Sequence, residues 1–220
     1  MVLGTGSFAA RRRARNRQEM VDAILHAGRQ VMREDGVAAL NLAEVARRVG
    51  VSAPSLYEYF ESKDALYDAL FRLGVRLWAE RVEALRSSEF ETPWDFLLAV
   101  FEAYLDFADD HPEMYQLIHE RPVPGFVPSP ESLAESVRLT EIGAEALAEW
   151  ADRGELAPGV PPDQAFDLVI AVMHGLTGGH VANEPGNRSP DSRFRRLVPP
   201  ALELFRAAWS RRGAGTMPQQ

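Results

Sequence analysis

Nine residues between positions 47 and 63 bring together cations, hydroxyl groups and small side chains. They are Arg47, Arg48, Ser52, Ala53, Pro54, Ser55, Tyr57, Tyr59 and Lys63. Arginine, lysine and tyrosine can donate hydrogen bonds to phosphate oxygens, and serine can bond to either kind of base edge. Small residues let the backbone approach the bases, and Ala53 or Pro54 can touch a thymine methyl group. The chemistry that this set suits is therefore binding to a nucleic acid.

The residues around this set predict two short helices and a tight turn. Asn41 and Glu44 make a pattern close to a capping box at the start of the first helix, which Gly50 can end. Ser52 is a second N-cap, and Pro54 lies in the first helical turn, where its missing N–H is not needed. The two helices must turn sharply within three residues. This is the helix-turn-helix arrangement, in which the second helix lies in a DNA major groove.

Three cations near these helices have two interpretations each. Lys63 directly follows Ser62, the expected cap of the next helix, where a cation disfavours the helix by roughly a few tenths of a kcal/mol. Its position makes sense if a phosphate docks at that helix end. The alternative is a surface lysine paired with a nearby acid. Arg47 and Arg48 end the first helix, where they suit either its negative end or DNA.

The run GVSAPSLYEYFESKDAL, residues 50–66, resembles the signature of the TetR family of transcription regulators. In that family a Gly-Val-Ser turn opens a short recognition helix, which is followed by aromatic residues and a Ser-Lys entry to helix 4. The residues in register are Tyr57, Tyr59, Phe60, Ser62, Lys63 and Leu66. The resemblance extends over roughly residues 15–70 and favours Tyr57 as a phosphate ligand.

The resemblance implies an all-α chain of about nine helices. A three-helix N-terminal domain would bind double-stranded DNA, and a long helix would join it to a C-terminal helical domain for ligand binding and dimerisation. A module with so few base-reading side chains recognises little sequence alone. Two copies about one helical turn apart on a near-palindromic operator are therefore expected.

Charge is distributed unevenly along the chain. The first 18 residues contain no acid and five arginines, namely Arg11, Arg12, Arg13, Arg15 and Arg17. The net charge is +2 over residues 1–73 and −10 over residues 74–220. A basic end on an acidic body indicates that one end approaches a polyanion. The arginine-rich arm is expected to enter a minor groove, and a solvated basic tail is the alternative.

Hydrophobic periodicity predicts further helices and no strand. These helices cover about residues 17–35, 62–86, 92–110, 112–118, 131–153 and 162–183, with a last one capped at Ser189-Pro190-Asp191. The proline-rich segment 121–130 is expected to be an ordered loop or a mobile lid. Pro199 and Pro200 are expected to break or kink the last helix, because each removes a backbone donor.

Four segments of chain follow from these elements. Residues 1–16 are predicted to be a flexible basic arm, and residues 17–61 the helix-turn-helix DNA-binding domain. Residues 62–212 are predicted to form the C-terminal ligand-binding and dimerisation domain, and residues 213–220 a disordered tail. The helix at 62–86 is the expected strut between the two domains.

Large side chains in the C-terminal part combine apolar bulk with a few polar groups, as small-molecule pockets do. The candidate ligand-binding residues are Trp78, Phe101, Tyr104, Met114, Tyr115, Trp150, Met173 and His174. For each residue taken singly, packing in the core is the alternative. The His174-Gly175 pair resembles a Trp-His-Gly stretch in the C-terminal domain of some TetR-family regulators, with Met173 in place of the tryptophan.

A glycine-rich stretch near residue 178 suits close packing of helices, since each glycine costs a helix about 1 kcal/mol relative to alanine. In the family that the chain resembles, the last two helices form the dimer bundle. The implied homodimer interface comprises Gly178, Gly179, Leu197, Ala201, Leu204, Phe205 and Trp209. The alternative is packing within one chain.

Other kinds of chemistry find little support. The chain has no cysteine, which excludes disulfides and thiolate ligands and fits a cytoplasmic protein. The histidines include no pair at the i, i+4 spacing of helical zinc ligands, so no metal is predicted. No nucleophile elbow or phosphate-binding loop occurs, so neither an enzyme nor a cofactor is predicted. No apolar run approaches the ~20 residues that a membrane-spanning helix needs.

The sequence therefore predicts a cytoplasmic, ligand-responsive DNA-binding regulator. We expect a repressor, released from its operator when a small-molecule effector binds the C-terminal domain. The main rival from another class is a small-molecule carrier or an enzyme that uses the C-terminal helical pocket. A second rival is a helical protein–protein interaction module whose basic arm binds an acidic partner or a membrane.

Overall fold

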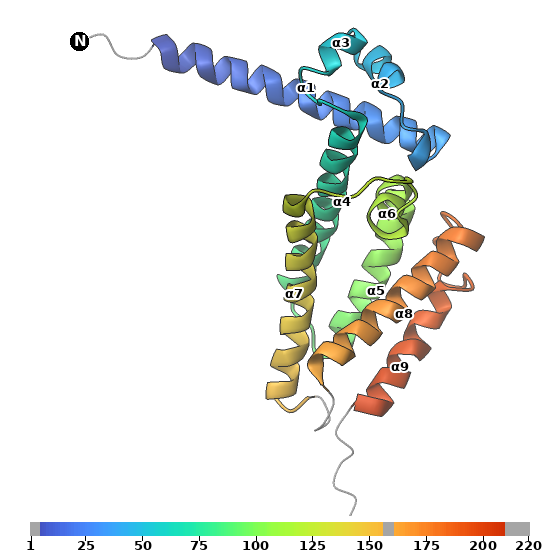
Figure 1. Ribbon diagram of the computed structural model, residues 1–220. Helices are drawn as coiled ribbons and strands as arrows, with labels where there is room; N and C mark the ends of the chain where they lie inside the picture. The colour runs from blue at the N-terminus through green and yellow to red at the C-terminus, as the bar shows by residue number, and fades with distance from the viewer. Residues whose placement is uncertain (1–4, 156–160, 210–220) are drawn as a thin grey trace, which may run out of the picture. The chain divides into compact units, whose positions relative to one another are not determined.

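The computed structural model describes residues 5–155 and 161–209 (Figure 1). Over these ranges the chain is helical and forms no strand, as predicted. The α-helices are α1 (Thr5–Asp35), α2 (Leu42–Val49), α3 (Ala53–Leu56), α4 (Lys63–Arg86), α5 (Pro93–Asp110), α6 (Pro112–Tyr115), α7 (Pro130–Asp152), α8 (Pro162–Asn183) and α9 (Val198–Trp209). Short 3-10 helices cover Val37–Ala39 and Arg195–Leu197, and a π-helix covers Gln116–Glu120. The tail predicted at 213–220 lies outside the described residues.

The helices belong to two compact units. The first unit comprises the described residues up to Gly74 together with Glu113–Ser132, and the second comprises Val75–Pro112 and the described residues from Leu133 onward. The chain therefore passes between the units three times. This division assigns the first half of α4 to the same unit as the helix-turn-helix. The boundary expected between residues 61 and 62 stays a prediction.

The first unit is built around a core that α1, α2, α3 and α4 share. Apolar side chains from all four helices are almost fully buried, namely Ile24, Val31, Met32, Val45, Leu56, Leu66 and Leu70. Gly28 allows close packing, because a Cβ at this position would lie 3.3 Å from Cδ1 of Leu70. The predicted periodicity of these helices is confirmed in this core.

Three predicted caps are present around α2 and α3. The Asn41 side chain accepts a hydrogen bond from the N–H of Ala43 at 2.9 Å. Gly50 ends α2 in the left-handed conformation, with φ 81°. The Ser52 hydroxyl accepts a bond from the N–H of Ser55 at 3.2 Å. These local bonds fix where each helix begins or ends, and so they set the sharp turn.

Three sequence predictions about helix bounds are wrong. α1 begins at Thr5 rather than near residue 17, so the described part of the predicted flexible arm, residues 5–16, is helical. Alanine and arginine are strong helix formers, and they dominate residues 9–15. α9 begins at Val198 rather than at the cap expected at Ser189-Pro190-Asp191. Pro199 and Pro200 therefore lie in its first turn, where missing donors are tolerated, and they do not kink it.

One buried carboxylate organises the first unit. The side chain of Glu113 in α6 is 1% exposed and accepts bonds from two arginines of α1. Nε and Nη2 of Arg29 both lie 2.9 Å from Oε1. Nε and Nη2 of Arg33 lie 2.9 and 2.8 Å from Oε2. Charge-assisted bonds of this kind are about twice as strong as neutral ones, so this cluster fastens α6 to α1.

A second carboxylate fixes the start of α7. Asp68 of α4 accepts bonds from the Ser129 N–H at 2.7 Å, the Ser129 hydroxyl at 3.1 Å and the Ser132 hydroxyl at 2.8 Å. Burial alone would raise the pKa of Asp68, but these bonds outweigh it and the pKa is lowered. The proline-rich segment expected at 121–130 thus ends at a firm anchor within the first unit.

In the second unit α5 packs against both α8 and α9 (Figure 1). Its buried residues occupy more than one face, as the sequence predicted for a surrounded helix: Leu97, Phe101, Tyr104, Leu105, Phe107 and Ala108. A Thr92–Asp95 capping box begins the helix, with the hydroxyl of Thr92 accepting from the Asp95 N–H at 3.2 Å. α5 is therefore the central element of this unit.

α8 departs from the expectation that no helix could span a membrane. Over Pro162–Asn183 an 18-residue window has a mean hydropathy of 1.3, and 33% of that window is buried. α8 is therefore long and apolar enough to cross a membrane, by length and composition only. The core helix of a soluble protein can meet the same two criteria. Apolar residues on its uncovered side, such as Leu168, are suited to contact with another helix.

We predict that Glu113→Gln lowers the free energy of unfolding by about 2 kcal/mol. The amide keeps the shape of the side chain but removes the negative charge that both arginines bind, and breaking a buried ion pair from one side is costly. Urea denaturation measures the effect. The matched control is Glu61→Gln, an exposed glutamate of the same unit, which should change stability by less than about 0.5 kcal/mol. Equal effects of the two changes would contradict the prediction.

Candidate nucleic-acid interface and effector site

The leading edge of α3 is open to solvent. Ser52 and Pro54 are exposed, and Ala53 and Ser55 are half-buried. The hydroxyls of Ser52 and Ser55 lie 2.8 Å apart and share a hydrogen bond. Tyr57 is 52% exposed and follows α3 directly. The small residues predicted to approach bases therefore occupy an accessible edge, with a phenol hydroxyl beside it.

The two arginines at the end of α2 differ in exposure and in their partners. Arg48 is 18% exposed and binds Glu34 of α1 at 2.8 Å and Glu44 at 2.8 Å. Arg47 is 72% exposed and binds only Glu44 among the described residues, at 2.7 Å. The hydrogen bond from Arg47, followed by that from Arg48, lowers the pKa of Glu44 to about 2. Arg48 thus ties α2 to α1, whereas Arg47 is accessible to DNA.

Lys63 begins α4 immediately after its cap. The Ser62 hydroxyl accepts the Ala65 N–H at 3.0 Å, which orients the first turn. Lys63 Nζ donates to the Ala38 carbonyl at 3.3 Å and lies 5.3 Å from the ring centroid of Tyr67. An ammonium group has three donors, so this placement leaves donor capacity for a phosphate.

Tyr59 lies in the turn after α3, not within the helix, and is half-buried. The guanidinium of Arg17 lies 5.0 Å from the centroid of its ring. Nη2 of Arg17 also donates to the Glu58 carbonyl at 3.2 Å. Tyr59 therefore has a structural contact with α1, and Tyr57 is the more accessible phenol of the two.

Three of the predicted ligand-binding residues, Tyr104, Trp78 and His174, form a ring cluster in the second unit. Trp78 meets the Tyr104 ring edge-on at a centroid distance of 4.8 Å, and His174 stacks on it at 5.5 Å. Phe101 and Met173 are buried in the same unit. Burial lowers the pKa of His174, so its imidazole is neutral near pH 7. A neutral imidazole offers one donor and one acceptor nitrogen.

The other three predicted ligand-binding residues are not part of this ring cluster. Met114 and Tyr115 belong to the first unit, where Met114 packs against Gly74 of α4. Burial raises the pKa of Tyr115 to about 12. Trp150 of α7 meets Phe96 edge-on at 6.0 Å. The candidate effector site therefore reduces to the cluster around Tyr104.

The buried face of α8 changes from apolar to polar along the helix. Its apolar residues Val169 and Met173 are followed on the same face by Thr177 and His180. The hydroxyl of Thr177 and Nδ1 of His180 are buried and have no hydrogen-bond partner among the described residues. Buried polar atoms of this kind normally bind a water or a ligand. Sequence analysis did not identify these two residues, although the i, i+3 spacing of Thr177 and His180 was visible.

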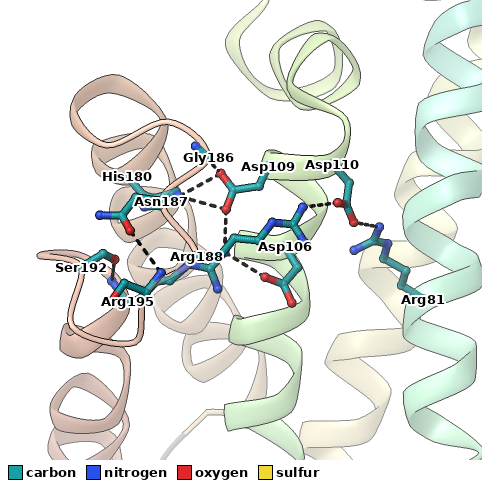
Figure 2. Close-up of polar contacts among 11 residues, drawn as sticks. Arg81, Asp106, Asp109, Asp110, His180, Gly186, Asn187, Arg188, Ser192 and Arg195 are labelled. Carbon is teal, nitrogen blue, oxygen red and sulfur yellow. Dashed lines mark hydrogen bonds and ion pairs between the residues drawn. The ribbon is translucent and has the colours of Figure 1, made fainter.

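A polar cluster at the end of α5 was also missed (Figure 2). The side chain of Asp109 is 2% exposed and accepts bonds from Nε2 of His180 at 3.0 Å, from Nη2 of Arg195 at 2.6 Å and from the Gly186 N–H at 2.9 Å. Burial would raise the pKa of Asp109, but these bonds lower it. They hold the loop between α8 and α9 against α5.

The neighbouring Asp110 extends this cluster towards α4. It binds Arg81 at 2.6 Å and also pairs with Arg188 of the α8–α9 loop (Figure 2). Arg195 contributes a further ion pair with Asp106 at 2.8 Å. No short-range sequence signal could reveal this cluster, because the bonded partners lie at least 29 positions apart in the sequence. The carboxylates of α5 thus connect α4, α5 and the segment before α9.

The predicted interface residues divide into exposed and covered sets. Leu204 is 74% and Leu197 41% exposed, whereas Ala201 and Phe205 are half-buried and Trp209 is buried. Phe205 and Trp209 stack at 4.6 Å. Gly178 is half-buried. Gly179 packs against the ring of Phe194 in the same chain, which is the intramolecular alternative.

In the described part of the chain, no group of three or more histidine, aspartate or glutamate side chains is arranged to hold a metal ion. The structure therefore offers an exposed helix-turn-helix, a long connecting helix and a second helical unit with an aromatic cluster. This combination defines the class of helix-turn-helix transcriptional regulators.

Comparison with known proteins specifies the class. The chain matches the family described as "Bacterial regulatory proteins, tetR family" over residues 24–70. It also matches "Tetracyclin repressor-like, C-terminal domain" over residues 97–211. The chain belongs to the TetR family of DNA-binding transcriptional regulators, as its signature indicated.

A curated relative is the HTH-type transcriptional regulator Rv1816 of Mycobacterium tuberculosis (strain ATCC 25618 / H37Rv). It is 28% identical over 146 residues, which cover 64% of this chain and 62% of that protein. The chain thus spans less than two thirds of the length of this relative.

Two solved structures share the fold. A protein of unknown function from Rhodococcus sp. RHA1 has a TM-score of 0.73 at 21% identity, covering 87% of this chain and 95% of that one. The regulator FadR of Bacillus subtilis, in complex with stearoyl-CoA, has a TM-score of 0.65 at 17% identity, covering 84% and 97%. At these identities the likeness establishes the fold alone.

We predict opposite effects of adding a methyl group at two glycines of α8. Gly179→Ala should lower the unfolding free energy by about 1–3 kcal/mol, because the new Cβ collides with Phe194. Gly175→Ala should raise it by up to about 1 kcal/mol, because nothing lies within 4 Å of the new Cβ and alanine favours helices. Thermal and urea unfolding measure both. Equal changes in the two variants would contradict the assignment of Gly179 to intramolecular packing.

Proposed function

We propose that this protein is a cytoplasmic, ligand-responsive repressor that binds a near-palindromic operator as a homodimer. A small molecule bound in the second unit releases it from DNA. The observation that carries the proposal is the accessible edge of α3, where Ser52, Pro54 and Tyr57 are exposed, followed in the chain by Lys63 at the start of α4. Reading sequence and binding phosphate are both chemically possible at this edge.

Dimerisation supplies the specificity that one copy lacks. α3 is four residues long, so few side chains can reach base edges. Two copies in a symmetric dimer double the number of bases read and require half-sites about one helical turn apart. The exposed leucines Leu168, Leu197 and Leu204 on α8 and next to or within α9 support an interface there.

The effector is inferred from the chemistry of the second unit. The ring cluster around Tyr104 suits an apolar body, and Thr177 and His180 on the buried face of α8 suit a polar group. Nε2 of His180 bonds to Asp109, which leaves Nδ1 and the Thr177 hydroxyl for a polar group of the ligand. We propose an effector with an apolar body and at least one hydrogen-bonding group. FadR, which shares the fold, is described with stearoyl-CoA, a molecule that has a long apolar chain.

The path of the chain suggests how effector binding in the second unit is coupled to DNA binding by the first. Asp110 ends α5 in the second unit, and Glu113, three residues later, fastens α6 to α1 in the first unit. A ligand that shifts the end of α5 would therefore also displace Glu113, which binds Arg29 and Arg33 of α1. A coupling free energy of about 1–3 kcal/mol is enough for a useful switch. α4 offers a second covalent path, because it passes from one unit to the other after Gly74.

The test of the function is binding to duplex DNA from the upstream region of the protein's own gene. Fluorescence anisotropy against salt concentration would compare this duplex with a scrambled one. We predict that Lys63→Ala weakens binding about tenfold and lowers the slope of log affinity against log salt by about one, as the loss of one phosphate contact does.

Arg48→Ala is the matched control, since Arg48 is tied to two glutamates away from the open edge. It should reduce the stability of the protein and leave the salt slope unchanged. Wild-type binding no better than to the scrambled duplex at every salt concentration would refute the proposed function.

A second prediction concerns the effector site. Thr177→Val should leave the unfolding free energy unchanged or raise it, because it removes a buried hydroxyl that lacks a partner. The same change should raise by about tenfold the effector concentration needed for release from DNA, because a hydrogen bond to the effector is lost. Urea unfolding and operator-release titrations measure the two effects. An unchanged release curve would remove Thr177 from the effector site.

A further inference from the structure

The N-terminal half of α1 has no role in the core of the first unit. Ile24 is the first core residue of this helix, and every residue from Ala10 to Glu19 is exposed. Figure 1 shows this part of α1 projecting beyond α2 and α3 without another helix beside it. A helix of this length is marginal by itself in water, so it depends on continuity with the packed half of α1.

The charge on this half of α1 makes it unusual. Five arginines lie between residues 11 and 17, which span roughly 9 Å of helix. Arg11 and Arg15 share one face and Arg13 and Arg17 another, both at i, i+4, where like charges repel by a few tenths of a kcal/mol. Among the described residues, Arg15 forms an ion pair with Glu19 at 3.4 Å, and both side chains are exposed. An anionic partner would remove this repulsion.

The position of the arm points to one partner. Arg17 is fastened to the Glu58 carbonyl and to the ring of Tyr59, directly after α3. The arm therefore leaves the unit next to the edge that reads DNA. From Arg17 back to Phe8 it reaches roughly 14 Å further, about the rise of four base pairs.

The helical form of the arm also fixes its mode of contact. An α-helix with its side chains is about 10–12 Å wide, whereas the minor groove is about 6 Å wide. The helix itself is therefore too wide for the minor groove, where an arginine-rich arm was expected from the sequence. The phosphate backbone remains accessible to arginines on several faces.

We infer that the helical arm Phe8–Glu19 is a second DNA-contacting element, which binds phosphates flanking the recognition site and reads no sequence. The inference rests on the proposed operator binding. It adds an electrostatic contribution to affinity that is equal for operator and non-operator DNA. Each dimer would carry two such arms, so its footprint extends beyond both half-sites.

The test changes Arg11, Arg12, Arg13 and Arg15 to alanine together. Alanine is the strongest helix former, so the arm stays helical and only its charge is lost. The matched control also removes four positive charges, at exposed arginines of the second unit: Arg76, Arg86, Arg138 and Arg153. Circular dichroism checks that both variants are folded.

The arm variant should lower the salt slope by about two to four and weaken operator and scrambled duplex by the same factor. The control variant should keep the wild-type slope. The wild-type protein should bind an operator duplex extended by about six base pairs at each end more tightly than the bare operator, and the arm variant should not distinguish them.

Three outcomes would overturn the inference. The arm variant could keep the wild-type slope, it could lose preference for the operator, or it could still favour the extended duplex. Loss of binding to phosphatidylserine vesicles with unchanged DNA binding would instead assign the arm, with its exposed Phe8, to a membrane surface. Failure of the wild-type protein to bind any duplex would refute operator binding itself, a different result from all of these.

Discussion

The shared carboxylate of Glu113 is the constraint on which the arrangement of the first unit depends. A carboxylate that is 1% exposed must be compensated, and here two guanidinium groups of α1 provide the compensation. The geometry is specific, because each carboxylate oxygen accepts from Nε and Nη2 of one arginine. α6 is thereby held in the same unit as the DNA-reading helices, although it follows α5 in the chain.

The sequence predicted the elements whose determinants are local. Asn41, Gly50 and Ser52 set the helix-turn-helix through bonds that span a few residues, and the bounds of α8 agree with the pattern of prolines and apolar residues. The start of α1 differs from the prediction because alanine and arginine favour a helix even in a strongly basic segment. Glu113 was missed because its partners are 80 and 84 residues away.

The candidate effector site shows the same division between local and distant information. Residue type identified Tyr104, Trp78 and His174, and the structure places their rings together. Residue type also suggested Met114 and Tyr115, but these two residues belong to the other unit. The size and polarity of a side chain do not reveal which residues it contacts. The buried polar atoms of Thr177 and His180 became recognisable only when their surroundings were known.

The discontinuous make-up of the first unit bears on the construction of hybrid regulators. A chimera that joined residues 1–74 of this protein to the sensor half of a relative would leave Arg29 and Arg33 opposite a foreign α6. The first unit ends only at Ser132, after a return of the chain through Glu113. A functional exchange has to transplant both pieces, or restore a glutamate at the matching position of the recipient. Modularity in this protein is a property of its packing and not of contiguous sequence.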